Sequence, residues 1–268
     1  MKTLIEIITE HIAYRKQIWN LAKNDMVKTY RGSVLGWIWA FLKPAINLSV
    51  YWFAFSVGLR SGKPVEGYPY ILWLMAGMIP WFYMRGMLID GARCLRKYSY
   101  LITKIKFPMA TIPTFVNLSD LFVHLMLVVI MIVSFTLAGF IPDIYYLQLP
   151  LYTAMAFIFF NCWGLFAGVI SAISRDFLNF IRSISMAFLW LSGIFYNVST
   201  IKVEWLKTFM LFNPITLVVN GYRNVFIYKQ WFWETPTEMA NYVCVTFVMF
   251  VLSIWAYKKL RRDIPDVL

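Results

Sequence analysis

The sequence predicts an all-α membrane protein with six transmembrane helices, a re-entrant hairpin between the fifth and sixth, and both termini in the cytoplasm. Of its 268 residues, 60% are apolar and only 14% are charged, whereas soluble domains carry about a quarter charged residues. The mean hydropathy is +0.64. The net charge of +12 comes from basic residues that stand between apolar runs, which is typical of membrane topology and excludes a nucleic-acid-binding surface.

The first 36 residues precede any apolar span. Leu4, Ile8, Ile12, Trp19, Ala22, Met26 and Tyr30 recur at spacings of three, four or seven, and basic residues occupy other positions. This pattern predicts an amphipathic helix that lies along the inner leaflet with its basic face toward lipid phosphates. A helix packed on the protein in the cytoplasm is the alternative.

Six later segments are apolar over a length close to the roughly 20 residues that cross a bilayer core. They are Trp37–Leu59, Tyr70–Asp90, Thr111–Ala138, Leu149–Ile173, Ser183–Ile201 and Met239–Tyr257. The segment 198–238 also contains an uncharged stretch, 208–222, but Asn213-Pro214 interrupts it. Because proline disfavours helix at the preceding residue, we expect this segment to re-enter the outer leaflet as one or two short helices.

The distribution of Lys and Arg sets the expected orientation. Segments 1–36, 91–110, 174–182 and 258–268 together hold 17 basic residues, and the alternating segments 60–69, 139–148 and 202–238 hold 6. Cytoplasmic loops carry the excess of Lys and Arg. Both termini are therefore expected in the cytoplasm of a multi-pass plasma-membrane protein, and we treat residues 1–268 as a single transmembrane domain.

Motifs for chemistry are absent from the sequence. It has no G-x-x-x-x-G-K-[ST] phosphate loop, no H-E-x-x-H, no G-x-S-x-G and no C-x-x-C. The chain is thus expected to be no enzyme and to hold no metal or cofactor. Asp120 and His124 stand four residues apart within the third span, where they could form a proton relay, an internal hydrogen bond or a subunit contact.

Several short motifs occur in a fixed order along the chain. They begin with Ser33–Trp39 before Lys43-Pro44, continue with Gly77–Phe82 and Phe107-Pro108, and end with Arg175-Asp176, Asn213-Pro214 and Tyr222-Arg223. Together they resemble the permease subunits of type-2 ABC exporters that move polysaccharides. Tyr51-Trp52-Phe53 and Gly62-Lys63-Pro64-Val65 are most similar to the teichoic-acid translocation permeases of Gram-positive bacteria.

This resemblance implies a homodimer joined to two copies of a separate ATPase subunit, which would bind the ATP and Mg²⁺. The cargo would be a teichoic acid, or a related cell-surface polysaccharide, on a polyprenyl diphosphate carrier. An ion-coupled carrier is one alternative, which would need intramembrane charges and internal repeats. A membrane enzyme that acts on lipid-linked sugars is the other, and it would need clustered carboxylates, histidines or arginines.

Three groups of residues are candidates for transport. Aromatic rings of spans one, two and five are expected to line the pathway, because ring faces stack tolerantly on sugars; these are Tyr51, Trp52, Trp73, Trp81, Phe82, Trp190 and Tyr196. Lys43 and Arg85 are expected to contact the diphosphate. The cytoplasmic segments 91–110 and 174–182 are expected to dock on the ATPase through Arg96, Tyr98, Leu101, Arg175 and Asp176.

Overall fold

The computed structural model describes residues 2–59 and 62–268, and within these residues the chain is helical apart from short connections and one isolated β-bridge between Val65 and Tyr68. The α-helices are α1 (Lys2–Ala13), α2 (Arg15–Tyr30), α3 (Trp39–Phe53), α4 (Tyr70–Lys97), α5 (Ser99–Thr103), α6 (Ile112–Leu137), α7 (Leu149–Ile173), α8 (Arg175–Leu191), α9 (Glu204–Leu211), α10 (Pro214–Arg223), α11 (Pro236–Leu260) and α12 (Ile264–Val267).

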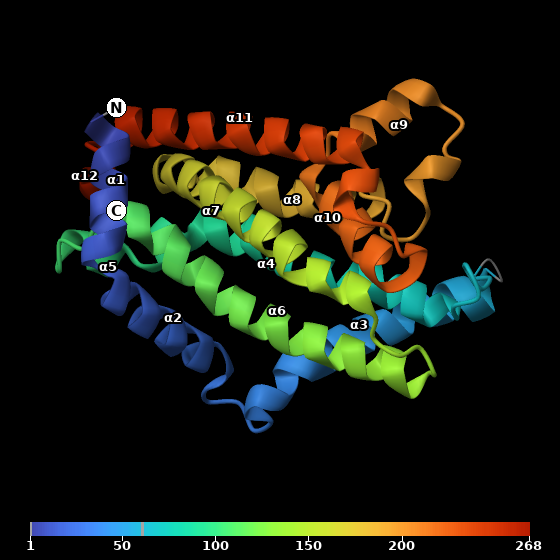
Figure 1. Cartoon of the computed structure of the whole chain (residues 1–268). Helices are drawn as coiled ribbons and strands as arrows, with labels where there is room; N and C mark the ends of the chain where they lie inside the picture. The colour runs from blue at the N-terminus through green and yellow to red at the C-terminus, as the bar shows by residue number, and fades with distance from the viewer. Residues whose placement is uncertain (1, 60–61) are drawn as a thin grey trace.

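Helix α4 is the centre of the bundle. It packs against α3, α6, α7, α8 and α10, and most of its side chains are buried in one contiguous core (Figure 1). The contact with α7 is close because glycines face each other: a Cβ atom on Gly91 would lie 3.1 Å from the Cα atom of Gly164. Small residues allow such close helix approach in membrane proteins.

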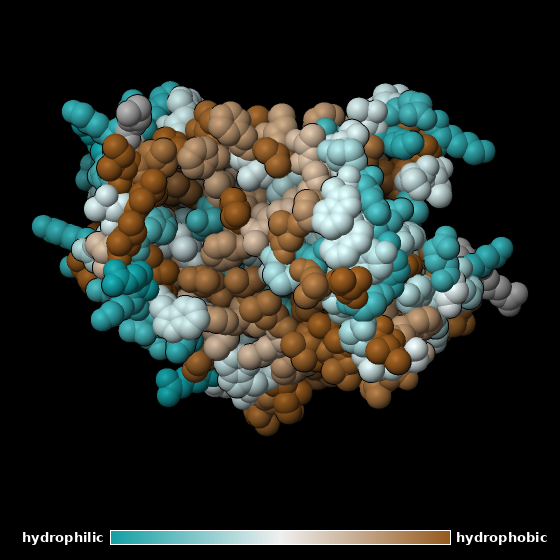
Figure 2. Space-filling model, viewed as in Figure 1, coloured by the Kyte–Doolittle hydropathy of each residue, from teal (hydrophilic) through white to brown (hydrophobic). Residues whose placement is uncertain are grey.

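Five of the six expected spans match helices that are long and apolar enough to cross a bilayer. In the described residues these segments are Gly36–Gly58, Tyr70–Lys97, Met109–Leu137, Ile144–Ile173 and Pro236–Leu260. The second extends beyond Asp90 through Lys97, so the first part of the expected cytoplasmic segment 91–110 continues α4. Figure 2 shows hydrophobic residues gathered across the middle of one face, with hydrophilic residues at its two ends.

The fifth expected span, Ser183–Ile201, has the wrong boundaries. Helix α8 begins at Arg175, directly after α7, where the side chain of Ser174 accepts a hydrogen bond from the backbone of Phe177. It ends at Leu191, before Gly193 adopts a positive φ of 64°. Its 17 residues span roughly 25 Å at about 1.5 Å per residue. The prediction from apolar residues placed the start of this helix too late, because the first turns of α8 contain charged residues.

The N-terminal region is two helices, not the single helix that was expected, because the backbone departs from helical geometry at Tyr14 (φ −100°, ψ 14°). Helix α2 packs on α6, where the rings of Trp19 and Phe122 meet, and its residues Ile18 and Ala22 are 5% and 0% exposed. Ile8 and Ile12 of α1 remain exposed. Helix α2 is therefore packed on the protein, and the contact of the N-terminal region with the inner leaflet stays a prediction.

The two ends of the bundle are formed by different segments of the chain. The N-terminus, the C-terminus and α5 lie together at one end, where Arg261 forms an ion pair with Glu6 at 2.6 Å (Figure 1). At the other end, α9 and α10 are joined at Asn213, whose side chain caps α10 by accepting a hydrogen bond from the backbone of Ile215 at 3.0 Å. The predicted helix break at Asn213-Pro214 is present, and α10 packs between α4 and α7.

Candidate functional site

A cavity of about 300 Å³ lies between α2, α3, α4 and α6. Lys43 of α3 and Arg85 of α4 both line it, so the structure brings the two predicted diphosphate ligands to one space. Phe82, one turn before Arg85 on the same helix, also lines this space. The two basic side chains reach it from separate helices because α3 packs against α4.

The charges around this cavity are not equally available. Asp90 pairs with Arg93 at 2.6 Å, and Lys43 lies over the ring of Trp39 at 5.7 Å. Arg85 is exposed and has no hydrogen bond or ion pair in the described part of the chain. Asp120 lies against Gly86, and its buried Oδ2 has no hydrogen-bond partner there. A guanidinium without a partner presents a planar fork that suits phosphate oxygens.

A second, smaller cavity of about 110 Å³ adjoins the first, because Asn47, Phe82 and Arg85 line both. Tyr51 and Trp81 line the smaller one, opposite side chains of α8. A cation and three predicted pathway rings, Tyr51, Trp81 and Phe82, therefore lie next to one another along α3 and α4. This arrangement offers attraction for an anion at one end and ring faces for apolar or sugar surfaces at the other.

The remaining predicted rings have other surroundings. Trp190 is 49% exposed and contacts Phe195, whose ring also meets Tyr51 with centroids 4.7 Å apart. The hydroxyl of Tyr196 donates to the backbone carbonyl of Trp190 at 2.7 Å. Trp52, at 38% exposed, is on the outer face of α3 and lines neither cavity.

Trp73 is a core residue that holds a buried arginine, and this corrects its expected place along the pathway. The guanidinium carbon of Arg223 lies 3.5 Å from the centre of the Trp73 ring. The same guanidinium donates to the backbone carbonyls of Gly193 and Ile194, each at 2.6 Å, and thereby fixes the segment that follows α8. Gly77 makes room for it, since a Cβ there would lie 2.8 Å from Nη2.

Asp120 and His124 do not form the pair that their spacing suggested. The Nε2 atom of His124 lies 2.7 Å from the hydroxyl of Tyr222, which in turn lies 2.7 Å from the hydroxyl of Thr153. This network joins α6, α10 and α7 in the core. It gives His124 a structural hydrogen bond, and both His124 and Asp120 line the 300 Å³ cavity.

Comparison with known proteins identifies the family of this chain. The residue pattern of the ABC-2 type transporter family matches residues 16–227. The chain belongs to this family. It is 25% identical over 264 residues to the O-antigen export system permease protein RfbA of Myxococcus xanthus, covering 97% of this chain and 98% of the relative. It is 21% identical over 253 residues to the protein of the same name in Klebsiella pneumoniae, covering 92% and 93%. As a permease subunit, the chain is not itself an enzyme.

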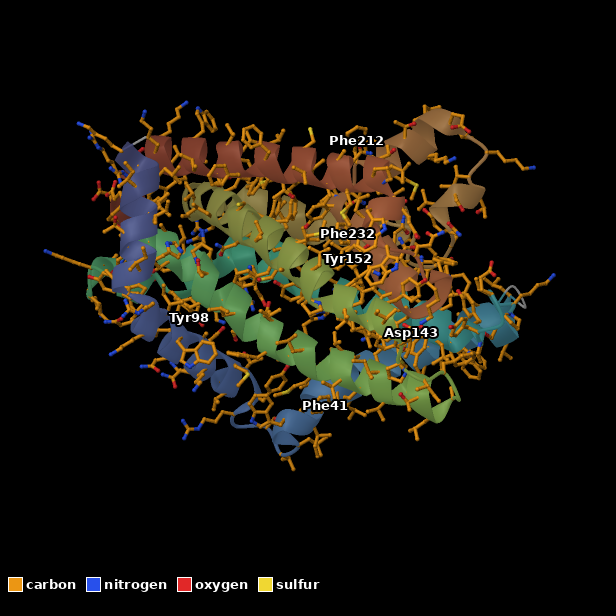
Figure 3. All side chains as sticks on the ribbon, viewed as in Figure 1. Phe41, Tyr98, Asp143, Tyr152, Phe212 and Phe232 are labelled. Atoms are coloured by element: carbon orange, nitrogen blue, oxygen red, sulfur yellow. The ribbon has the colours of Figure 1, made fainter. Side chains whose placement is uncertain are left out.

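In this ABC-2 permease, two of the predicted coupling residues point inward. Tyr98 is 6% exposed and Leu101 is 4% exposed, so neither side chain can dock on another protein. The hydroxyl of Tyr98 donates to the carboxylate of Asp25 on α2, beside Lys97 at 2.8 Å. Figure 3 shows Tyr98 near α2 at the end of the bundle that holds the termini. Burial, and then the bond to Asp25, raise the pKa of Tyr98.

The other coupling candidates of the permease lie at the same end. Arg96 donates to the backbone carbonyls of Ser171 and Ala172 at 2.5 and 2.7 Å, so its guanidinium caps α7. Arg175 and Asp176 are exposed in the first turn of α8. Around α5, the large exposed apolar side chains are Tyr100 and Ile105, at 40% and 60%.

Sequence reasoning missed the role of Arg223 in this ABC-2 fold. It stands directly after the uncharged stretch 208–222, and a charged residue beside such a run needs partners when it is buried. That signal was available. Phe195, which joins Tyr51 to Trp190, carried no signal, because an aromatic residue near a span end is usual in membrane proteins.

Proposed function

We propose that this chain is the membrane subunit of an ATP-driven exporter that moves a lipid-linked cell-surface polysaccharide from the cytoplasmic side to the outside. The full-length similarity to O-antigen export permeases supports the polysaccharide class. The observation that carries the proposal is the pair of adjoining cavities, one lined by Lys43 and by Arg85, which is unpaired in the described residues, and one with aromatic walls.

In this proposal, Arg85 and Lys43 receive the diphosphate of a polyprenyl carrier. Arg85 is exposed and unpaired in the described residues, so binding an anion breaks no existing contact. Lys43 adds a second positive charge to the same cavity. Sugar units then pass the rings of Tyr51 and Phe82, which contact them without fixed hydrogen-bond geometry, and Trp81, which is only 2% exposed, forms part of the cavity wall. Trp52, Trp190 and Tyr196 extend the aromatic surface toward the outer end.

The proposed cargo is an O-antigen-like polysaccharide or a teichoic acid. The names of the relatives favour the former, and the motifs Tyr51-Trp52-Phe53 and Gly62–Val65 favour the latter. Both polymers share the feature that the cationic cavity recognises, a diphosphate-linked lipid carrier. The proposed cargo class therefore depends on this carrier, and the polymer itself is distinguished by the export assay below.

The proposed assembly is a homodimer with two ATPase subunits in the plasma membrane. The exposure of α3 supports the dimer, because only 6% of the apolar stretch within Gly36–Gly58 is buried within this chain and a second copy could cover the rest. The end that holds both termini, α5 and the start of α8 is proposed to face the cytoplasm, with α8 as the sixth crossing. The α9–α10 pair then re-enters from the outer side. Tyr100, Ile105, Arg175 and Asp176 are proposed to meet the ATPase, in place of Tyr98 and Leu101.

The test is export by the reconstituted complex. Arg85→Ala combined with Lys43→Ala should lower export of the lipid-linked polymer by about tenfold or more, since each charge-assisted bond to a phosphate contributes about 1.5–3 kcal/mol. Lys16→Ala, an exposed lysine of α2 outside both cavities, is the matched control. Complex assembly and basal ATP hydrolysis should be unchanged. Normal export by the double variant refutes the diphosphate site, and comparison of O-antigen-type and teichoic-acid substrates identifies the polymer.

A further inference from the structure

A separate polar cavity of about 310 Å³ lies at the other end of the bundle, between the segment after α8, helices α9 and α10, and the start of α11. Its wall contains four side-chain amides, a tyrosine and a carboxylate; these residues are Asn197, Asn220, Asn224, Gln230, Tyr228 and Glu238. Lys207 of α9 lines it as well. None of these residues takes part in the proposed diphosphate site or in the ring pathway.

Hydrogen bonds within the wall hold several of these groups in place. The side chain of Asn197 accepts from the backbone and the hydroxyl of Ser199 at 2.9 and 2.8 Å. Its amide donates to the hydroxyl of Tyr228 at 3.3 Å, and Trp73 donates to that same hydroxyl at 3.0 Å. One side of the cavity is thus fixed to the rigid core around Trp73.

Other groups keep free hydrogen-bonding capacity. Asn220 donates to one carboxylate oxygen of Glu238 over a long 3.4 Å, which leaves the second oxygen of Glu238 without a hydrogen bond in the described residues. Lys207 is half-buried and forms no ion pair there. The cavity therefore offers an acceptor carboxylate, a donor ammonium and amides that both donate and accept.

This combination selects a ligand with several neutral hydroxyl groups. Each hydroxyl both donates and accepts, which matches amides and a carboxylate together. A diphosphate fits less well than at the cavity near Arg85, because a single ammonium and no guanidinium are among the described side chains that line this wall. An acyl chain fits the apolar groove of about 570 Å³ between α7 and α11, lined by residues such as Leu151 and Phe247, and not this cavity. The volume is at the lower end of the range of ligand pockets, roughly 300–1,000 Å³, and suits one small unit.

We propose that this outer cavity binds a single sugar residue, a polyhydroxylated ring. The inference rests on the proposed function, because an exporter of polysaccharide delivers such rings to this end. Residues of α9, α10 and the start of α11 all line the cavity, so a bound sugar would contact these three helices together. The cavity therefore acts as an acceptor for the emerging chain, distinct from the cationic cavity near Arg85.

The experiment measures sugar binding by the purified full-length chain in lipid nanodiscs. Saturation-transfer NMR is recorded with free glucose, galactose, mannose, rhamnose and N-acetylglucosamine, each as a separate probe. At least one should receive saturation from the protein. Asn220→Ala and Glu238→Gln should each weaken that binding by about tenfold, because each removes a polar partner from the wall. Lys207→Met is a third cavity variant, at a half-buried position of α9, and it should also weaken binding.

Matched controls use neighbouring residues outside the cavity. Lys202→Met and Glu204→Gln change an exposed lysine and an exposed glutamate close to Lys207, and both should bind sugar as the unmodified chain does. The inference is overturned when no sugar receives saturation, or when all three cavity variants, folded by their melting curves, bind as well as the controls. Polymer export by the unmodified complex is measured in parallel. Export without sugar binding refutes only this inference, whereas absence of export refutes the proposed function.

Discussion

Replacing Arg223 by lysine tests whether the buried guanidinium holds together the end of the bundle that contains α9 and α10. Arg223 is 1% exposed and makes two 2.6 Å bonds to the carbonyls of Gly193 and Ile194, directly after α8. Lysine keeps the positive charge but has no planar fork, so it can replace one of these bonds and loses the stacking on Trp73. A bond to a charged group contributes about 1.5–3 kcal/mol and a desolvated cation–π contact about 2 kcal/mol. Allowing for partial rearrangement, we expect a loss of about 2–4 kcal/mol.

The assay is thermal unfolding of the purified chain, followed by fluorescence-detected size exclusion after heating. At roughly 2–4 °C per kcal/mol for a chain of this size, the Arg223→Lys variant should melt roughly 4–16 °C lower. Arg182→Lys is the control, since Arg182 is exposed on α8 and its side chain has no hydrogen bond or ion pair among the described residues. A melting temperature within about 1 °C of the control would refute the role assigned to the guanidinium.

Three further perturbations follow from the packing. Tyr98→Phe removes one donor from Asp25 and should destabilise the chain by about 1–3 kcal/mol, whereas Tyr100→Phe at an exposed position should not; equal melting of the two variants would contradict the buried bond. Gly221→Ala should lower the free energy of unfolding by about 1–3 kcal/mol, because the new Cβ would lie 2.3 Å from the Tyr152 ring. Its melting temperature is compared with that of Gly58→Ala, where the nearest atom to the new Cβ is 3.9 Å away. Tyr100→Asp with Ile105→Asp should prevent co-purification of the ATPase, and retention of the ATPase at the level seen with Ile141→Asp, at the opposite end, would show that this surface does not dock.

Local sequence was sufficient for features that depend on hydrophobic length and on backbone restriction. The helix Leu149–Ile173 has the boundaries that its apolar run predicts, and the break at Asn213-Pro214 lies where proline excludes the helical conformation. Arg85 and Lys43 were selected as basic residues inside spans, and the structure places both at one cavity. These features depend on the conformational limits of neighbouring residues or on the hydrophobicity of a whole segment, and both can be read from the local sequence.

The start of α8 was missed for a related reason. Hydropathy assigns a cost to each charged residue, so the run appeared to begin at Ser183, but Arg175 and Asp176 lie at the polar end of the bundle where charges are solvated. The helix boundary depends on where that end lies, and this is set by packing against α4 and α7.

The sequence by itself determined the class of the protein: a helical membrane permease with no catalytic motif, most of its crossings, and the basic and aromatic residues available for cargo. Only the tertiary structure decided which side of each helix those residues occupy. Tyr98 and Leu101 look like docking groups in a basic loop, yet both are buried, and Tyr98 is bonded to Asp25 of α2. Trp73 looks like a pathway ring, yet it covers Arg223. Their surroundings depend on partners 73 and 150 positions away in the chain, Asp25 and Arg223, and no local pattern encodes such contacts.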